Sequence, residues 1–300
     1  MRQLLDVKSL TREEINAIIE RAFEMKKLVL AGEKCSLLKG KTVTTLFYEN
    51  STRTKTSFER AGMLVGADVN SLDIATSSIQ KGESLVDTGK TLDALGTDIV
   101  IIRHQASGTP LFLSKNVKAS VVNAGDGTHA HPTQALLDLM TMIEHFGSVE
   151  GLKVTIMGDI VHSRVARSNL VCLKKMGAEV TMCAPLTLLP KEFSAHCKMT
   201  TSPTEAVAGA DVIMGLRMQL ERQNCGPFPS LKEYNRLYGI NNALLEKAKP
   251  TTVVMHPGPV NRGVEIAGEV LDGKASLIET QVTNGLAVRM SVLSLIGEGR

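Results

Sequence analysis

Two spacings of apolar residues alternate along the chain. Short runs rich in Val, Ile and Leu are typical of buried strands, and they occur at residues 42–48, 98–102, 120–122, 153–157, 179–183, 211–216 and 251–255. Between them, apolar residues recur every three or four positions, which predicts helices over 53–64, from 132 onward, over 163–176 and over 284–296. Thr11 and Glu14 form a capping box that opens an N-terminal helix. Strands alternating with helices predict an α/β protein with parallel sheets covered by helices on both faces.

The chain of 300 residues is long enough for two domains of ordinary size. Gly147 and Gly151 interrupt the pattern near its middle. We therefore predict two similar three-layer domains, residues 1–147 and 148–284, and a C-terminal helix, 285–300, that packs back on the first. Residues 222–239, with glycine, amides and prolines but no clear period, are predicted to form a loop.

Composition narrows the functional classes. Net charge is +3, aromatic residues make up 3% and Trp is absent, which argues against a nucleic-acid platform. No apolar run reaches the roughly 18 residues of a membrane helix, and the N-terminus lacks a signal-peptide stretch. The five cysteines are scattered without a CxxC pair, which favours reduced thiols in a cytoplasmic protein.

A phosphate-binding turn follows the first strand. Ser51, Thr52, Arg53 and Thr54 stand where a helix begins, and backbone N–H groups at that point are unpaired. An ordinary N-cap needs only one hydroxyl, whereas this turn has three hydroxyls, a guanidinium and a second cation at Lys55.

Two glycine-rich nucleotide-binding motifs are excluded. Residues 82–91 resemble a Walker A loop but have six residues between the glycines instead of four. No GxGxxG occurs, so the dinucleotide fingerprint is missing.

Further polar residues follow other strands of the first half. Arg103 stands at a strand end, where ligands bind in parallel sheets. A lone arginine there is more often a surface residue, but its position beside the predicted phosphate turn favours a place in the site. His131 and Gln134 stand at a helix start that follows a glycine-rich turn, and could donate to a carbonyl or amide. His129 and His131 have no acidic or Cys partner at ligand spacing, so we expect no metal there.

The second half repeats this arrangement. Arg164 stands at a loop–helix junction, and Arg217 and Gln219 follow a strand, so the three could grip two carboxylates. Surface arginines paired with Glu221 or Asp159 are an equally open interpretation. A stiff turn around Pro257 and Gly258 could offer carbonyl acceptors, and a cis bond before Pro259 is plausible.

Three of these segments resemble motifs of the aspartate and ornithine carbamoyltransferase family. They are Phe47-Tyr48-Glu49-Asn50-Ser51-Thr52-Arg53-Thr54, His131-Pro132-Thr133-Gln134 and His256-Pro257-Gly258-Pro259. Thr133, the Arg217-x-Gln219 pair and the segment around Pro259 look like the aspartate branch. Gly258 departs from members that carry Leu before the proline, and Gly stiffens the bond less.

The resemblance implies transfer of a carbamoyl group from carbamoyl phosphate to L-aspartate in pyrimidine synthesis, without a cofactor or metal. By similarity, Ser51, Thr52, Arg53 and Thr54 hold phosphate, and Arg103, His131 and Thr54 act on the carbonyl. Gln134, Pro257 and Gly258 take the carbamoyl amide, and Arg164, Arg217 and Gln219 take aspartate.

The resemblance also implies a homotrimer in which residues matching Ser77 and Lys81 reach a neighbouring subunit's site. Lys81 would then touch both substrates. Regulatory chains or other pathway enzymes are further partners that it allows. The alternatives are a carbamoyltransferase for another amine, such as ornithine, and a non-catalytic binding module for carbamoyl phosphate or a nucleotide. Arg217 argues against a cationic substrate tail, and Arg53, Arg103 and His131 together argue against a mere binding module.

Overall fold

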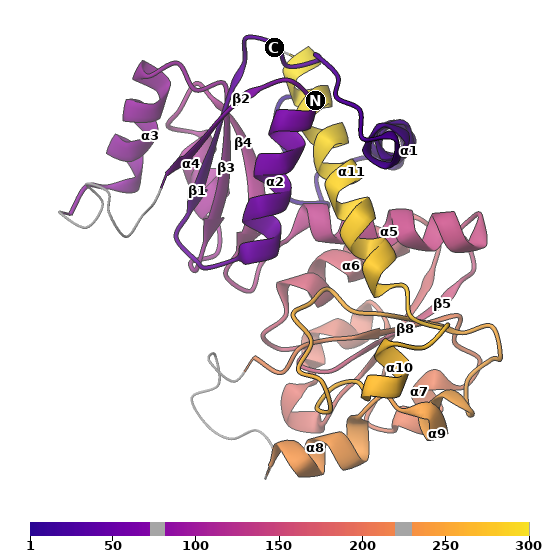
Figure 1. The fold of residues 1–300 in the computed structure, drawn as a ribbon. Helices are drawn as coiled ribbons and strands as arrows, with labels where there is room; N and C mark the ends of the chain where they lie inside the picture. The colour runs from indigo at the N-terminus through magenta and orange to yellow at the C-terminus, as the bar shows by residue number, and fades with distance from the viewer. Residues whose placement is uncertain (73–81, 220–229, 300) are drawn as a thin grey trace. The chain divides into compact units, whose positions relative to one another are not determined.

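The computed structural model describes residues 1–72, 82–219 and 230–299. These form two compact units, one of Met1–Met140 with Thr283–Arg300 and one of Thr141–Val282. Each unit is built on its own parallel sheet, and helices cover the sheets (Figure 1). The predicted α/β fold class is confirmed. The boundary at residue 147 stays a prediction.

The first unit has a four-stranded sheet in the order β2-β1-β3-β4. Its strands are β1 (Thr42–Phe47), β2 (Asp68–Leu72), β3 (Ile99–His104) and β4 (Ser120–Asp126). Its helices are α1 (Arg12–Ala31), α2 (Thr52–Leu64), α3 (Leu85–Ala94), α4 (Thr109–Ser114) and the start of α5 (Pro132–Phe146). The capping box at Thr11 is confirmed, since its hydroxyl accepts from the Glu14 N–H at 3.2 Å.

Alternation along the strands creates the layers of this unit. Leu46 and Val100 pack with Leu92 of α3 and Leu113 of α4 on one face of the sheet. On the other face, the Thr45 hydroxyl bonds Glu59 of α2 at 3.3 Å. Figure 1 shows α2 and α3 on opposite sides of the sheet.

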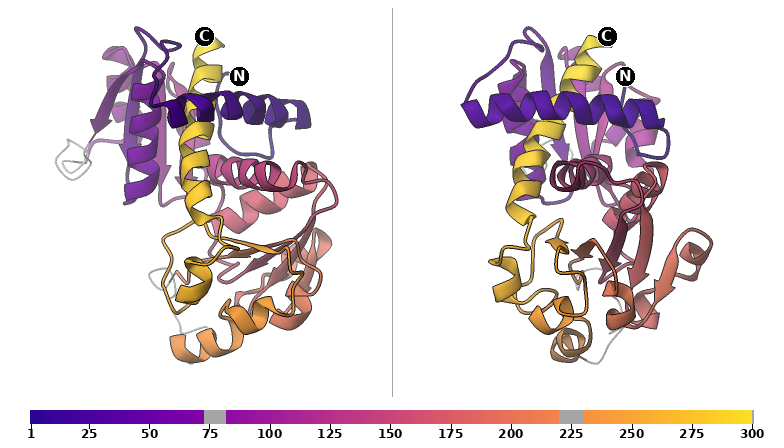
Figure 2. Two further views of the ribbon diagram at one scale, coloured as in Figure 1. Left: turned by 45° about the vertical axis from the view of Figure 1, so that its right-hand side comes forward. Right: turned by 90° about the vertical axis from the view of Figure 1, so that its right-hand side faces the viewer.

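The final helix, α11 (Ile278–Glu298), returns to the first unit, as the sequence predicts. The Ser291 hydroxyl donates to the Ile18 carbonyl of α1 at 2.7 Å. Arg289 Nη1 bonds the Ser57 hydroxyl of α2 at 2.9 Å. Both views in Figure 2 show α11 crossing α1.

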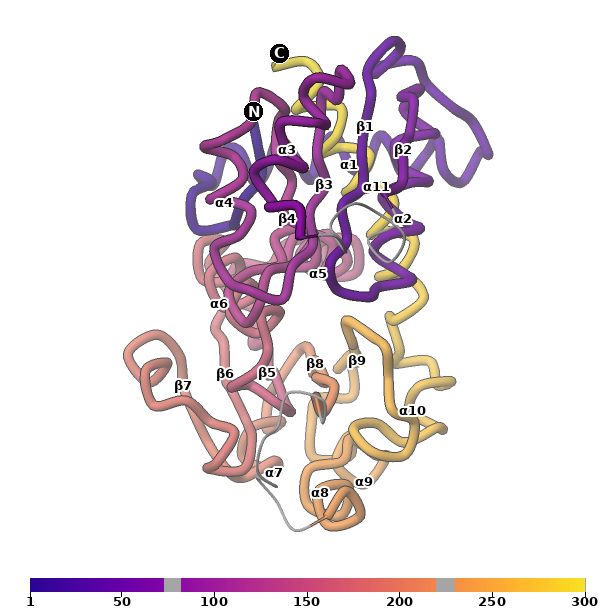
Figure 3. The backbone as a smooth tube through the Cα atoms, turned by 90° about the vertical axis from the view of Figure 1, so that its left-hand side faces the viewer, coloured from indigo at the N-terminus to yellow at the C-terminus, as the bar shows by residue number. Residues whose placement is uncertain are grey.

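The second unit has a five-stranded sheet in the order β7-β6-β5-β8-β9, which Figure 3 lets the eye follow. Its strands are β5 (Lys153–Met157), β6 (Glu179–Cys183), β7 (Lys198–Thr200), β8 (Val212–Gly215) and β9 (Val253–Met255). Its helical segments are α6 (Arg164–Lys175), η3 (Leu186–Leu188), η4 (Lys191–Ala195), α7 (Pro203–Val207), α8 (Leu231–Tyr238), α9 (Asn242–Leu245) and α10 (Gly268–Leu271). Met157, Ile213 and Val254 pack with Val207 and Val270 in its core.

One prediction is wrong and two strands were not foreseen. Residues 231–238 of the predicted loop form α8, which Ser230 caps by accepting from the Glu233 N–H at 3.1 Å. Its few apolar residues stand three and four positions apart, and a pattern this short does not distinguish a helix from a loop. Residues 222–229 lie outside the described part. The unforeseen strands, β2 and β7, are sheet edges with polar sequences.

The segment that resembles a Walker A loop forms a helix instead. Ser84 caps α3, and Gly89 lies inside the helix, where it faces Val117 and Leu113. A Cβ at Gly89 would lie 2.6 Å from Val117 Cγ1 and 2.7 Å from Leu113 Cδ1. The glycine therefore serves close packing between α3 and the α4 region.

We predict that Gly89→Ala lowers the free energy of unfolding. Crowding in a packed core costs about 1–3 kcal/mol, which exceeds the helix-propensity gain of about 0.5–1 kcal/mol. The urea midpoint measures this change. The control is Lys90→Ala on the exposed side of α3, which should leave the midpoint unchanged. Equal midpoints for Gly89→Ala and the unsubstituted chain would contradict the close packing.

Candidate active site

The predicted phosphate turn lies at the N-terminus of α2. Ser51 is the N-cap, and its hydroxyl accepts from the Thr54 N–H at 3.4 Å. Thr52 and Arg53 are exposed, whereas Thr54 is buried. The first turn of α2 has no acidic residue. An arginine at the positive end of a helix is unfavourable by itself and becomes favourable beside an anion. The turn is thus suited to a phosphate.

Strand pairing brings Arg103 to the same sheet edge. Phe47, the last residue of β1, pairs with Arg103 in β3. The guanidinium is mostly buried, and its Nη2 contacts Glu49 Oε1 at 2.6 Å. Glu49 precedes the Ser51 turn, so this ion pair holds Arg103 toward the turn. No local pattern in the sequence predicts this role of Glu49.

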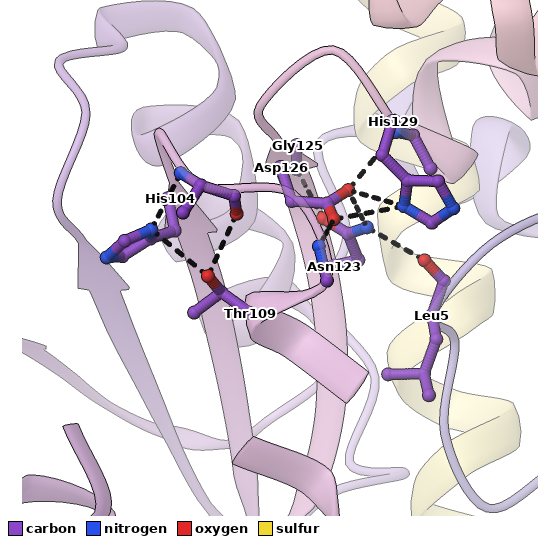
Figure 4. A network of polar contacts seen from close by, with 10 residues as sticks. Leu5, His104, Thr109, Asn123, Gly125, Asp126 and His129 are labelled. Atoms are coloured by element: carbon purple, nitrogen blue, oxygen red, sulfur yellow. Dashed lines mark hydrogen bonds and ion pairs between the residues drawn. The ribbon is translucent and has the colours of Figure 1, made fainter. Parts of the chain in front are cut away.

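Asp126 organises the next loop, the one that leads to His131. Its carboxylate is fully buried and accepts from the N–H of Gly108 at 2.7 Å, Asn123 Nδ2 at 2.8 Å and the N–H of Ala130 at 3.1 Å. Figure 4 shows this carboxylate between Asn123 and His129, whose Nδ1 lies 3.0 Å away. The carboxylate thereby joins the end of β4 to the starts of α4 and α5.

These contacts correct one point about the histidines. An acidic residue, Asp126, does stand at contact spacing from His129, three positions before it. In the part of the chain that the structure describes, no group of three or more His, Cys, Asp or Glu side chains is arranged to hold a metal ion. The contact of His129 with Asp126 therefore belongs to the hydrogen bonds that hold this loop.

Hydrogen bonds outweigh burial at Asp126. Burial, the largest effect, raises the pKa of a carboxyl group, but bonds from His129, Asn123 and Gly108 together hold the pKa of Asp126 below its ordinary value. His104, at the end of β3, shows the opposite balance, since burial lowers the pKa of its imidazole. Its Nδ1 accepts from the Ala106 N–H at 2.9 Å and stands 3.1 Å from the Thr109 hydroxyl (Figure 4).

His131 and Gln134 begin α5. Both side chains are buried, and the His131 carbonyl accepts from the Gln134 N–H at 3.1 Å. Gln134 Nε2 donates to Asp138 Oδ1 at 2.9 Å. The described part of the first unit therefore presents the phosphate turn, Arg103 and the start of α5 at the carboxyl ends of adjacent strands.

The second unit presents its own group of predicted residues. Arg164 is buried and begins α6, which Ser163 caps. The Asp159 carboxylate accepts from the Gln219 N–H at 3.3 Å, and Gln219 Nε2 donates to the His162 carbonyl at 3.1 Å. These bonds join the loop after β5 to the segment after β8, so Arg164, Arg217 and Gln219 lie on neighbouring strand ends.

Close backbone approach makes this junction possible. Gly158 has a φ of 131°, and a Cβ there would lie 2.6 Å from the Leu216 carbonyl oxygen. A side chain at Gly158 would therefore separate the two segments.

Glu265 joins the third predicted segment, the turn around Pro257 and Gly258, to the segment that follows β8. This role was not predicted from the sequence. Its Oε1 accepts from the Met218 N–H at 2.8 Å, and its Oε2 accepts from the Asn261 N–H at 2.8 Å. Burial raises the pKa of this carboxyl group. It thus ties the Arg217–Gln219 segment to the turn that includes Pro257 and Gly258. The bond before Pro259 is cis, as the sequence suggests.

Several residues named in the sequence analysis are not part of the contacts described above. Ser77, Lys81, Glu221 and Cys225 are outside the described residues. Cys35, Cys172, Cys183 and Cys197 form no disulfide in the part of the chain that the structure describes. No helix in the described ranges is long and apolar enough to cross a membrane.

We predict that Asp126→Asn destabilises the protein by about 2–3 kcal/mol at pH 7, because an amide replaces a charged acceptor among several donors. A lowered folded pKa adds stability above the unfolded value, and that stability is lost as pH falls through the folded pKa. The stability difference between variant and unsubstituted chain should therefore shrink as pH falls below about 3.8. Urea unfolding across pH measures it, with Asp68→Asn, at an exposed carboxylate of β2, as control. A pH-independent difference would contradict this account.

Comparisons with known proteins agree with the motifs. Residues 2–144 match the family model "Aspartate/ornithine carbamoyltransferase, carbamoyl-P binding domain". Residues 150–296 match "Aspartate/ornithine carbamoyltransferase, Asp/Orn binding domain". The "Aspartate carbamoyltransferase catalytic subunit" of Heliobacterium modesticaldum is 54% identical over 300 residues, covering 99% of this chain and 96% of the relative.

Two solved structures share the fold. One is aspartate transcarbamoylase from Trypanosoma cruzi in complex with carbamoyl phosphate and aspartate, with a TM-score of 0.89 and 30% identity over 98% of this chain and 96% of that one. The other is ornithine carbamoyltransferase from Pyrococcus furiosus, also with a TM-score of 0.89 and 30% identity, over 100% of this chain and 98% of that one. Sequence, fold and strand-end chemistry agree, and the chain belongs to the aspartate/ornithine carbamoyltransferase family.

Proposed function

We propose that this protein transfers the carbamoyl group of carbamoyl phosphate to the amine of L-aspartate, giving N-carbamoyl-L-aspartate and phosphate in pyrimidine synthesis. The observation that carries the proposal is the turn Ser51–Thr54, which puts three hydroxyls and the Arg53 guanidinium at the N-terminus of α2. The name of the Heliobacterium relative, at 54% identity over nearly all of both chains, supports the same reaction.

Each strand-end group has a role in this proposal. Ser51, Thr52, Arg53 and Thr54 bind the phosphate, and Arg103 reaches both the phosphate and the carbonyl oxygen. His131 and Thr54 polarise that carbonyl. Gln134 and the carbonyls of Pro257 and Gly258 accept from the carbamoyl NH2, and Arg164, Arg217 and Gln219 bind the carboxylates of aspartate.

The chemistry requires no covalent intermediate on the protein. The neutral amine of aspartate attacks the carbonyl carbon and forms the C–N bond, and the carbonyl oxygen gains a negative charge. Arg103, His131 and Thr54 stabilise this oxyanion. The bond from carbon to the phosphate oxygen then breaks, and the departing phosphate takes the electron pair and accepts the amine proton. Holding two polyanions in line accelerates the step through orientation.

Aspartate is favoured over ornithine by residues rather than by overall fold. The aspartate enzyme structure from Trypanosoma cruzi and the ornithine enzyme structure from Pyrococcus furiosus match this fold equally well, each with a TM-score of 0.89. Arg217 stands beside Gln219 after β8, and a cationic substrate tail would be repelled there. The described segment 216–219 thus supports an acidic tail.

The proposal also covers the domain boundaries, the oligomeric state and the cellular location. Residues 1–147 are the carbamoyl phosphate domain, 148–284 the aspartate domain, and 285–300 the returning helix. The contact-defined units and the two matched family domains support a division near these positions. The enzyme is a cytoplasmic homotrimer in which Ser77 and Lys81 complete the site of an adjacent subunit. Sedimentation gives the oligomeric state.

We predict that Arg53→Ala lowers kcat/KM for carbamoyl phosphate by about 10²–10³-fold, because a preorganised cation on the leaving group is lost. The assay is carbamoyl-aspartate formation, with ornithine tested in parallel. The control is Arg60→Ala, an exposed arginine on the same helix, which should keep kcat/KM. Unchanged turnover in Arg53→Ala would overturn the phosphate site. Carbamoyl phosphate binding without turnover in the unsubstituted protein would instead indicate a binding module.

We also predict that Arg217→Ala raises the KM for aspartate by about 10–100-fold, the effect of losing a charge-assisted hydrogen bond. The dissociation constant of carbamoyl phosphate, measured by calorimetry, should stay the same. Arg236→Ala, an exposed arginine of α8, is the matched control. An aspartate KM that does not change would show that Arg217 lies outside the acceptor site.

A further inference from the structure

A buried polar group lies behind Gln134 in the first unit, and the proposed reaction does not use it. Asp138, one turn along α5, is 0% exposed, and Arg289 of α11 is 5% exposed. Gln134 Nε2 donates to Asp138 Oδ1 at 2.9 Å. Arg289 Nη1 bonds the Ser57 hydroxyl at 2.9 Å, and the guanidinium lies 5.2 Å from the centre of the Phe58 ring.

The chemistry of Asp138 determines the orientation of the Gln134 amide. An ionised carboxylate only accepts hydrogen bonds, so the amide must turn its NH2 toward Asp138. Its other end, Oε1, then points away as an acceptor. A neutral group at position 138 that could donate would allow the amide to rotate by half a turn. Gln134 would then present N–H donors instead of an acceptor.

Arg289 of α11 interacts electrostatically with Asp138. Burial, the largest effect, and the neighbouring charge of Arg103 lower the pKa of Arg289, whereas Asp138 raises it, and the result is about 10. Arg289 is therefore still a cation at neutral pH. A cation close to a buried carboxyl group favours its ionised form.

Stability alone does not account for these buried charges. Buried ion pairs contribute little net stability, because desolvation offsets their attraction, and an apolar pair of similar volume is often as stable. A fixed amide orientation is something that an apolar pair could not supply.

We propose that Asp138 is a positioning residue that fixes Gln134 as a hydrogen-bond acceptor, and that the charge of Arg289 supports Asp138 in this role. The pair makes the site select an acyl phosphate whose acyl group carries N–H donors. Carbamoyl phosphate has such donors, and acetyl phosphate has a methyl group in their place. The inference rests on the proposed function and adds the origin of its donor selectivity.

The test is a double-mutant cycle between Gln134 and Asp138. The KM for carbamoyl phosphate and the inhibition constant of acetyl phosphate are measured for the unsubstituted enzyme, Gln134→Ala, Asp138→Asn and the double variant. Asp138→Asn should raise the KM for carbamoyl phosphate by about 10-fold or more, the effect of one lost hydrogen bond. The inhibition constant of acetyl phosphate should stay within about two-fold, since its methyl group makes no such bond. In the Gln134→Ala background, Asp138→Asn should add almost nothing.

Two further variants keep the test informative if Asp138→Asn folds poorly. Arg289→Met should lower the selectivity for carbamoyl over acetyl phosphate, and Arg289→Lys, which keeps the charge, should restore it. Asp93→Asn is the matched control, because Asp93 accepts from the N–H groups of Lys118 and Ala119 away from Gln134. It should leave the selectivity unchanged.

The outcomes separate the two proposals. Equal loss for both acyl phosphates, or full additivity in the double variant, would overturn the positioning role while leaving the reaction intact. An unsubstituted enzyme that forms no carbamoyl-aspartate would overturn the proposed function itself, and the inference with it.

Discussion

Parallel strand pairing is the constraint on which the candidate site depends. Every strand pair in both sheets is parallel, so the carboxyl ends of neighbouring strands meet at one edge. Residues distant in sequence become neighbours there. The register of Phe47 with Arg103 does this in the first sheet, and the pairing of β5 with β8 does it in the second. Loops after the strands then differ in chemistry while the scaffold stays the same.

Buried carboxylates hold three of the segments that carry polar side chains at these edges. Asp126 holds the loop before α5, Asp159 joins two loops of the second unit, and Glu265 ties a third segment to them. Carboxylates suit this task because they accept several N–H donors at once. Arg164 and Arg217 thereby lie next to backbone that is fixed before any anion arrives.

The sequence predicted what depends on local pattern. The capping residues Thr11 and Ser51, most long helices and the inner strands follow from hydroxyls and apolar spacing within a few residues. The edge strands β2 and β7 were not predicted because they are polar and lack an apolar run. The helix α8 was not predicted because eight residues are too few to show a helical period. The roles of Asp126, Asp138 and Glu265 were not predicted for another reason. Glu265 binds Met218, which is far away along the chain. Asp126 and Asp138 bind Ala130 and Gln134, four residues away, but only the folded loop and helix start reveal these bonds.

The return of α11 to the first unit has a consequence for biosynthesis. Ser291 and Arg289 bond residues of α1 and α2, so the first unit includes segments from both ends of the chain. A ribosome delivers the N-terminal part long before this helix. The second unit is contiguous and can fold as soon as it emerges, whereas the first must wait until α11 has been translated. The domain made first is thus completed last, and the emerging chain exposes the surface that α11 will cover.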